Sequence, residues 1–147
     1  MTGEEISKVK LEIEKDMIFK CDMGLMNVKD FYIDEKNKDE AKMLGPNPAR
    51  LLAAAVLGCM SASFIFCLQK KQFTLDDLKA EAEIIIVRNE KKLSRVKEIN
   101  IKLVPITSDP AILKRINQCS KFFEQYCTIT ESVRAGIQVN LDIKPTN

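Results

Sequence analysis

The chain has 147 residues, long enough for one domain, 1–147, with a sizeable hydrophobic core. Its 23 basic and 21 acidic residues nearly cancel, so the net charge of +2 gives no reason to expect nucleic acid or an anionic membrane as a partner. The sequence contains no histidine, which excludes His-based triads, His general bases and mixed His/Cys zinc sites.

The first 42 residues predict three strands followed by a loop. Val9, Leu11 and Ile13 alternate with charged residues, as in a half-buried strand. The segments "MIFKCDMG" and "MNVKDFYI" predict two more strands with a turn at Gly24. The polar run 34–42, "DEKNKDEAK", is expected to be an exposed loop.

A long apolar helix is predicted over residues 47–71. Asn47 is a suitable cap, Pro48 suits the first turn, and no charge occurs between positions 51 and 69. The run is long enough to cross a bilayer, but its many small residues and the amphipathic strands around it favour a buried core helix without a membrane. A stripe of small side chains recurs every fourth residue, which suits close helix contact and makes dimerisation a natural way to cover the helix; it consists of Ala54, Gly58 and Ala62.

The second half of the chain alternates strands and helices. The runs "LKAEAEIII" and "INIKLV", joined by "RNEKKLSR", predict an antiparallel hairpin. Ser108 or Asp109 caps a second helix, whose apolar stripe continues to Phe123 and which places Cys127 near its end. A short piece, "ITESVR", leads to a last strand in which apolar residues alternate over 137–143. This order predicts the α+β class, with antiparallel sheets packed around the long helix.

Five cysteines are present, and none of them form a C-x-x-C pair, so a zinc ribbon or thioredoxin-like motif is not expected. The N-terminal segment lacks the apolar core of a signal peptide, which predicts a cytoplasmic location. An odd number of cysteines in a reducing compartment argues against a disulfide framework. Cys67 follows Cys59 by eight residues, about 12 Å along a helix and too far to bridge, and Cys119 stands in the same relation to Cys127. Cys67, Cys119 and Cys21 are therefore predicted to be buried core residues.

Two segments resemble the OsmC/Ohr family. "GPNPARLLAAAVLGCMSASF" resembles its signature helix, with a Gly, a nearby Pro and a Cys two to three turns inside. "FFEQYCTITESVRAGIQVNLDI" is similar to its second element, a helix ending in Tyr-Cys, a short helical turn and a final strand. The two cysteines in these elements, Cys59 and Cys127, are 68 residues apart, and the resemblance covers most of the chain from Gly45 onward.

The resemblance implies an intertwined α+β homodimer and a thiol peroxidase site that needs no metal, haem or flavin. Cys59 would attack the peroxide O–O bond and become a sulfenic acid, and Cys127 would condense with it to a disulfide. The implied partners are a second copy of the chain, a small-molecule hydroperoxide and a dithiol reductant.

One family feature is missing. In the peroxidase branches a carboxylate in the Asn-Pro-Glu-like motif holds an Arg against the reactive Cys, whereas this chain has Ala49 there and no Arg before Arg50. Arg50 faces the side of the helix opposite Cys59, so Lys20, Arg134 or a group from a second chain remain as replacements. The alternative function is therefore a non-peroxidase module of the same fold, which binds a small hydrophobic ligand or handles thiols at the dimer interface.

Overall fold

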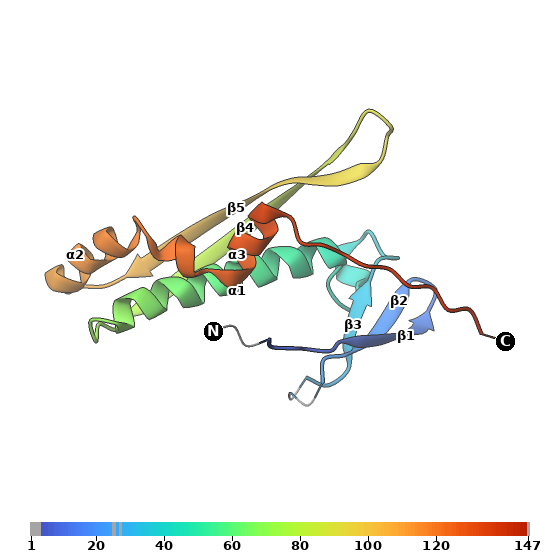
Figure 1. Cartoon of the computed structure of the whole chain (residues 1–147), viewed down its shortest axis with the longest axis horizontal. Coiled ribbons are helices and arrows are strands. Elements are labelled where there is room, and N and C mark those ends of the chain that lie inside the picture. The colour runs from blue at the N-terminus through green and yellow to red at the C-terminus, as the bar shows by residue number, and fades with distance from the viewer. Residues whose placement is uncertain (1–3, 25, 27, 147) are drawn as a thin grey trace. The chain divides into compact units, whose positions relative to one another are not determined.

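The computed structural model describes residues 4–24, 26 and 28–146, and its fold is α+β with antiparallel sheets (Figure 1). In chain order the elements are β1 (Lys10–Lys15), β2 (Ile18–Asp22), β3 (Phe31–Asp34), η1 (Glu40–Lys42), α1 (Pro48–Gln69), β4 (Asp77–Arg88), β5 (Ser94–Ile106), α2 (Pro110–Cys119), η2 (Phe123–Tyr126) and α3 (Thr128–Ala135). The chain divides into two compact units, 1–52 and 53–147. A single domain over 1–147 stays a prediction.

The N-terminal unit contains the three predicted strands, which pair antiparallel in the order β1-β2-β3. Gly24 adopts a positive φ of 90° in the turn after β2, a conformation that suits glycine. The expected half-burial of the first strand is wrong, because every residue of β1 is exposed. Leu11 and Ile13 are largely exposed, with 56% and 71% of their surfaces accessible.

One buried carboxylate, that of Asp34, organises the loop after β3. The expectation that the loop 34–42 is exposed is therefore wrong at its first residue. Asp34 is fully buried and accepts hydrogen bonds from the backbone N–H groups of Lys36, Asn37 and Leu44 and from the Asn37 side chain. These bonds, chiefly those from Asn37, outweigh the effect of burial and lower the pKa of Asp34 from 3.8 to about 2. The ionised carboxylate therefore fixes the shape of the loop.

Asp34→Asn is expected to destabilise the protein at neutral pH, because an amide cannot accept all of these bonds and brings donors of its own. The pKa of Asp34 is lower in the folded state, so its contribution to stability is present above about pH 4 and is lost as the pH falls toward 2. Urea unfolding between pH 2 and pH 6 would test this. The difference from wild type in the free energy of unfolding should narrow with acidification, with exposed Asp30→Asn as the control. A difference that is constant over this range would contradict the prediction.

The long helix is confirmed as α1 and begins where the sequence indicated. Asn47 Oδ1 accepts a hydrogen bond from the backbone N–H of Arg50 (2.9 Å), and Pro48 is the first helical residue. By length and composition α1 could cross a membrane, but 33% of its most apolar window is buried inside the chain. Its buried side forms part of a hydrophobic core, whereas the predicted stripe of Ala54, Gly58 and Ala62 is exposed.

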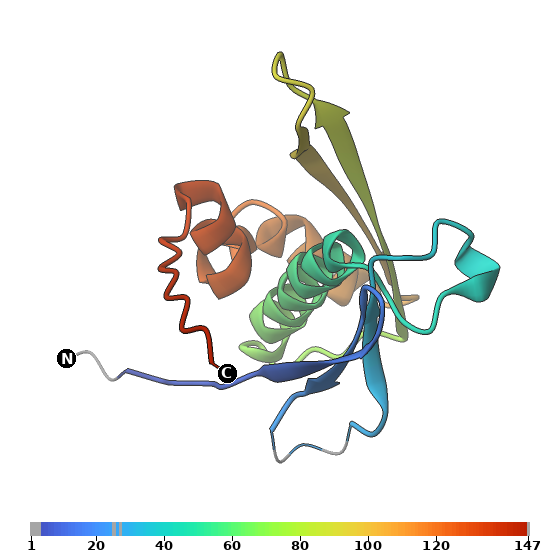
Figure 2. The same ribbon diagram turned by 90° about the vertical axis from the view of Figure 1, so that its right-hand side faces the viewer.

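The C-terminal unit is built around the predicted hairpin of β4 and β5, which pair antiparallel along their whole length. The register shifts between Ile85 and Ile86, where Lys97 of β5 has no partner in β4, and Ile86 beyond this bulge is half exposed. α1 and the α2–α3 segment run alongside this hairpin, and its tip extends beyond the helices (Figures 1 and 2). The core between them is a single cluster; its fully or nearly buried members are Val56, Met60, Phe64, Cys67, Leu68, Ile116, Cys119, Phe123 and Cys127.

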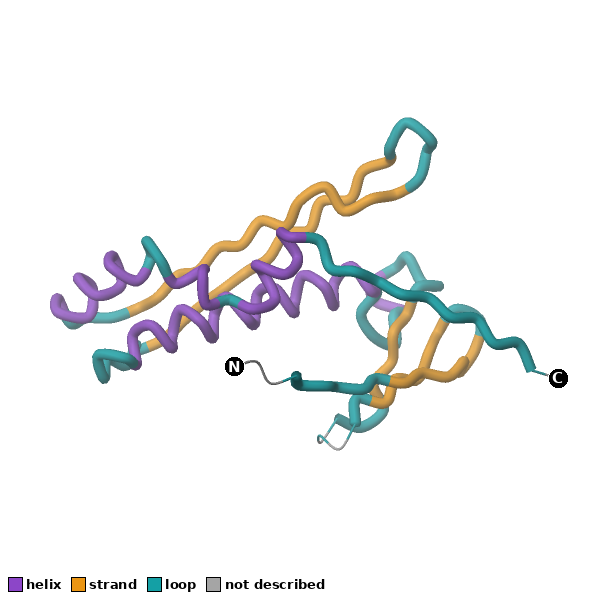
Figure 3. Tube along the Cα trace, viewed as in Figure 1, coloured by secondary structure: helices purple, strands orange, loops and turns teal. Residues whose placement is uncertain are grey.

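Two predictions about the last third of the chain are wrong. The second helix is capped by Asp109 as expected, but it ends at Cys119, and Cys127 follows a separate 3₁₀ turn instead of ending the same helix. The break lets Phe123 turn into the core against Phe64, with ring centroids 5.2 Å apart. The final strand is absent as well, because residues 137–146 are extended but pair with no strand of the described chain (Figure 3). Their apolar side chains are 62–86% exposed at Ile137, Val139, Leu141 and Ile143.

Candidate functional site

The two cysteines singled out by the sequence lie beside each other at the start of α3. Cys127 is the residue immediately before the helix, in an extended conformation that turns the chain out of η2. Cys59 lies on α1, and its sulfur accepts a hydrogen bond from the backbone N–H of Ile129, in the first turn of α3 (3.5 Å). Cys59 packs against the core cluster that contains Cys127, and it is among the groups that influence the pKa of the Cys127 thiol. Both thiols are free.

The first turn of α3 supplies the polar environment of the pair. The backbone N–H groups at a helix N-terminus have no partner within the helix and carry partial positive charge, which favours a thiolate. The N-terminus of α1 cannot take this role, because Cys59 lies about three turns inside that helix. The missed contribution comes from α3, which was recognised only as a short helical piece, and nothing in its sequence indicates that it faces Cys59.

The two sulfurs differ in access. Cys127 is fully buried, whereas Cys59 is partly exposed. Burial raises the pKa of the Cys127 thiol, but hydrogen bonding with Thr130, Cys59 and Ser63 outweighs this effect, so the pKa lies below its ordinary value of 9.0. The Cys127 thiol donates to Thr130 Oγ1 (2.9 Å), and the hydroxyl can reverse this bond to stabilise a thiolate. The pair therefore combines one reachable sulfur with one that is buried and stabilised as an anion.

Thr130 and Ser63 are the polar residues that sequence reasoning missed. Both side chains are buried, at 5% and 8% exposure, whereas most Ser and Thr side chains in proteins are exposed. Thr130 lies three residues after Cys127, the spacing at which a capping side chain reaches the third residue of a helix. That spacing is the only signal in the sequence that could have identified it.

The basic residues considered as replacements for the family's Arg are each paired with carboxylates. Arg50 pairs with Glu40, and Lys20 pairs with Asp30 at 3.7 Å. The Arg134 guanidinium contacts Glu124 (2.9 Å) and Glu131 (2.6 Å). The donor that the structure places on the Cys59 sulfur is instead a backbone N–H.

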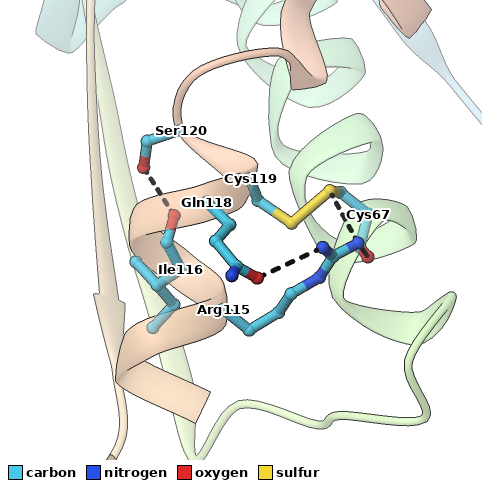
Figure 4. Close-up of a disulfide and its surroundings, with 6 residues drawn as sticks. All are labelled: Cys67, Arg115, Ile116, Gln118, Cys119 and Ser120. Carbon is cyan, nitrogen blue, oxygen red and sulfur yellow. Dashed lines mark hydrogen bonds between the residues drawn. A yellow bond between two sulfur atoms is a disulfide. The ribbon is translucent and has the colours of Figure 1, made fainter. Parts of the chain in front are cut away.

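The prediction that Cys67 and Cys119 are only core residues is wrong. Both are buried, but they form a disulfide that joins the last turn of α1 to the end of α2, with Cα atoms 6.0 Å apart (Figure 4). The spacing argument treated only pairs within one helix, whereas this bond joins two helices. Cys21 is buried on β2 as predicted and is a free thiol. Within the described residues, no three His, Cys, Asp or Glu side chains cluster to hold a metal ion.

The chain is similar to known proteins in sequence and in fold. Residues 37–142 match the sequence model of the family described as "OsmC-like protein". A structure of an OsmC-like protein of unknown function from Vibrio cholerae superposes with a TM-score of 0.69 and 12% identity, covering 88% of this chain and 94% of that one. A hypothetical protein from Aquifex aeolicus gives 0.65 and 24%, covering 90% and 89%.

A third structure is that of the organic hydroperoxide resistance protein OhrB of Bacillus subtilis. It superposes with a TM-score of 0.58 and 21% identity over 95% of this chain and 98% of that one. At identities below 25%, these superpositions show similarity of fold. No curated protein matches the sequence.

Proposed function

Because the chain belongs to the OsmC-like protein family, we propose that it is a thiol-dependent hydroperoxide reductase that uses Cys59 and Cys127. The observation that carries the proposal is the placement of two free thiols beside each other at the start of α3, with one sulfur reachable and the other buried. Similarity to an organic hydroperoxide resistance protein supports an organic hydroperoxide as the substrate.

The reaction follows from the placement of the two sulfurs. The Cys59 thiolate attacks one oxygen of the O–O bond, which breaks and releases an alcohol once the leaving oxygen is protonated, and Cys59 becomes a sulfenic acid. The Cys127 sulfur then attacks Cys59 Sγ, the S–O bond breaks, and water leaves as the disulfide forms. An external dithiol reduces this disulfide and departs as a disulfide itself.

The order of attack rests on exposure. A hydroperoxide from solution can reach the partly exposed Cys59, whereas the fully buried Cys127 can be reached only by a group already inside the protein. The Ile129 N–H bond to Cys59 also lies where it can stabilise negative charge on the attacking sulfur, the task that the missing carboxylate and Arg perform in the peroxidase branches.

The alternative function, a non-peroxidase module that binds a small hydrophobic ligand or handles thiols at the dimer interface, has less support within a single chain. One apolar cleft beside the core cluster has a volume of about 200 Å³ and is lined by Met60, Phe64, Ile101 and Phe123, among others. Ligand pockets typically have volumes of about 300–1,000 Å³. This cleft is smaller, and neither Cys59 nor Cys127 lines it.

The proposal includes a homodimer. The exposed stripe of Ala54, Gly58 and Ala62 on α1 and the extended, apolar segment 137–143 are surfaces that a second copy would cover. An unpaired segment with alternating apolar residues is suited to adding a strand to a neighbouring sheet. Both features are costly in an isolated chain, which supports a partner of the same sequence.

The proposed function is tested by adding one equivalent of cumene hydroperoxide, an organic hydroperoxide, to protein treated with a dithiol. We expect two thiols to be lost and a Cys59–Cys127 disulfide to be found by mass spectrometry. Cys127→Ser should instead leave a sulfenic acid on Cys59 that dimedone traps, and Cys59→Ser should leave Cys127 unmodified, because Cys127 is buried. Cys21→Ser is the matched control and should behave as wild type. Survival of both thiols in excess hydroperoxide would contradict the proposed activity.

A further inference from the structure

We propose that the Cys67–Cys119 disulfide is a positioning bridge that holds Cys127 against Cys59 and does not itself take part in the catalytic cycle, an inference that rests on the proposed function of that pair. The bridge and the reactive pair connect the same two segments of the chain. Cys59 and Cys67 lie on α1, while Cys119 ends α2 and Cys127 precedes α3.

The connection between Cys119 and Cys127 is short. Residues 120–126 separate them, and they include a turn after α2 and the 3₁₀ turn η2. Short 3₁₀ turns have poorer hydrogen-bond geometry than an α-helix and hold their shape less well. A covalent bond at Cys119 therefore limits how far Cys127 can move from α1, because it fixes the base of this segment to the last turn of that helix.

Noncovalent contacts reinforce the bridge on the same side. Arg115 Nη2 donates to the backbone oxygen of Cys67 (3.1 Å) and lies 3.7 Å from the Cys67 sulfur (Figure 4). The other end of the guanidinium reaches Gln118 Oε1 at 3.5 Å. Phe123 then packs edge-on against Phe64 of α1. The segment that carries Cys127 is thus attached to α1 at successive points. Among the described residues, the disulfide is the only covalent bond between this segment and α1.

The two cysteine pairs differ in access to a reductant. Cys67 and Cys119 are 1% and 0% exposed, whereas Cys59 is partly exposed. Thiol–disulfide exchange requires that the attacking thiolate reach a sulfur atom. A dithiol that reduces a Cys59–Cys127 disulfide in each turnover therefore leaves the buried bridge intact, so the positioning persists from one cycle to the next.

The bridge should affect only the second of the two chemical steps, which are attack on the hydroperoxide and formation of the Cys59–Cys127 disulfide. Attack on the hydroperoxide needs only Cys59 and its environment. Formation of the Cys59–Cys127 disulfide depends on how often the Cys127 sulfur meets Cys59, which is the quantity that a tether increases. Loss of the bridge should slow the second step and leave the first unchanged.

The test measures this second step without a peroxide. Cys21→Ser protein, which retains the bridge, is mixed with 5,5′-dithiobis(2-nitrobenzoate). The Cys59 thiolate displaces one thionitrobenzoate and becomes a mixed disulfide, and Cys127 then attacks Cys59 Sγ and displaces the second. We expect Cys67→Ser/Cys119→Ser in the same background to release the second thionitrobenzoate about tenfold or more slowly. The rate of the first release should stay within about twofold, whereas general loosening of the fold would change that rate too.

A second variant guards against misfolding. Cys67→Ala/Cys119→Val keeps the site apolar and should give the same split between the two rates, after circular dichroism has shown a folded protein. A second-release rate equal to that of the bridged protein in either folded variant would overturn the positioning role. Because this assay uses no hydroperoxide, inactivity toward hydroperoxides would contradict the proposed function alone.

Discussion

Removing the Cys67–Cys119 disulfide is expected to lower the free energy of unfolding by about 4 kcal/mol. The bond closes a loop of 52 residues, and chain entropy predicts this amount for a loop of that length, because the unfolded chain gains freedom when the loop is open. For a protein of this size the loss corresponds to a fall in melting temperature of roughly 10 °C. The effect should be the same for Cys67→Ala/Cys119→Val and for wild type unfolded in the presence of a dithiol.

The measurement is urea unfolding with and without reductant, in a Cys59→Ser/Cys127→Ser background so that only one bridge can form. Cys21→Ser is the matched control, because Cys21 is buried as well but bonded to no other cysteine. It should change stability by no more than about 1 kcal/mol. Equal stability of the oxidised and reduced proteins would show that the bridge contributes nothing to the fold.

Gly58→Leu is expected to convert the proposed homodimer into monomers without unfolding the chain. A Cβ atom at Gly58 meets nothing within 4 Å in the isolated chain, so leucine fits there and also favours the helix. In a close helix–helix contact the added side chain weakens the association free energy by about 1–3 kcal/mol. A twofold-symmetric dimer contains the substitution in both protomers, so this cost occurs twice. The dissociation constant should then rise by at least about 30-fold.

Sedimentation velocity over a range of micromolar concentrations would measure this change. Lys114→Leu is the control, since it places the same side chain on an exposed face of α2, away from the stripe. A wild-type protein that is monomeric and folded at these concentrations would contradict the dimer. A Gly58→Leu protein that remains dimeric would show that the stripe lies outside the interface.

Elements with strong local signals could be predicted from the sequence. The start of α1 was predicted through Asn47 and Pro48, and its predicted end at residue 71 lies two residues beyond the observed end at Gln69. The hairpin was predicted through alternation in both strands. These signals lie within each segment, so they need no knowledge of how segments pack. The cap of α2 at Asp109 was predictable for the same reason.

The parts that were not predicted depend on contacts between segments. The end of α2 at Cys119 follows from the packing of Phe123 on Phe64, which no pattern around residue 120 encodes. Alternation at residues 137–143 indicates a segment able to form a strand but says nothing about whether the same chain provides its partner. The Cys67–Cys119 bond joins positions 52 residues apart in the sequence. The hydrogen bond to the Cys59 sulfur comes from the backbone N–H of Ile129, and a backbone group leaves no pattern in the sequence.

The Cys67–Cys119 bond also determines the covalent topology of the molecule. The loop that it closes contains the whole β4–β5 hairpin, including the exposed tip at residues 89–93. A protease that cuts the tip produces two fragments that stay joined through the sulfur bridge, so the nicked protein keeps its mass until a reductant separates them. A Cys59–Cys127 disulfide would enclose this loop in a second, concentric ring. The protein would then carry two covalent rings around one hairpin, of which only the outer one opens and closes with turnover.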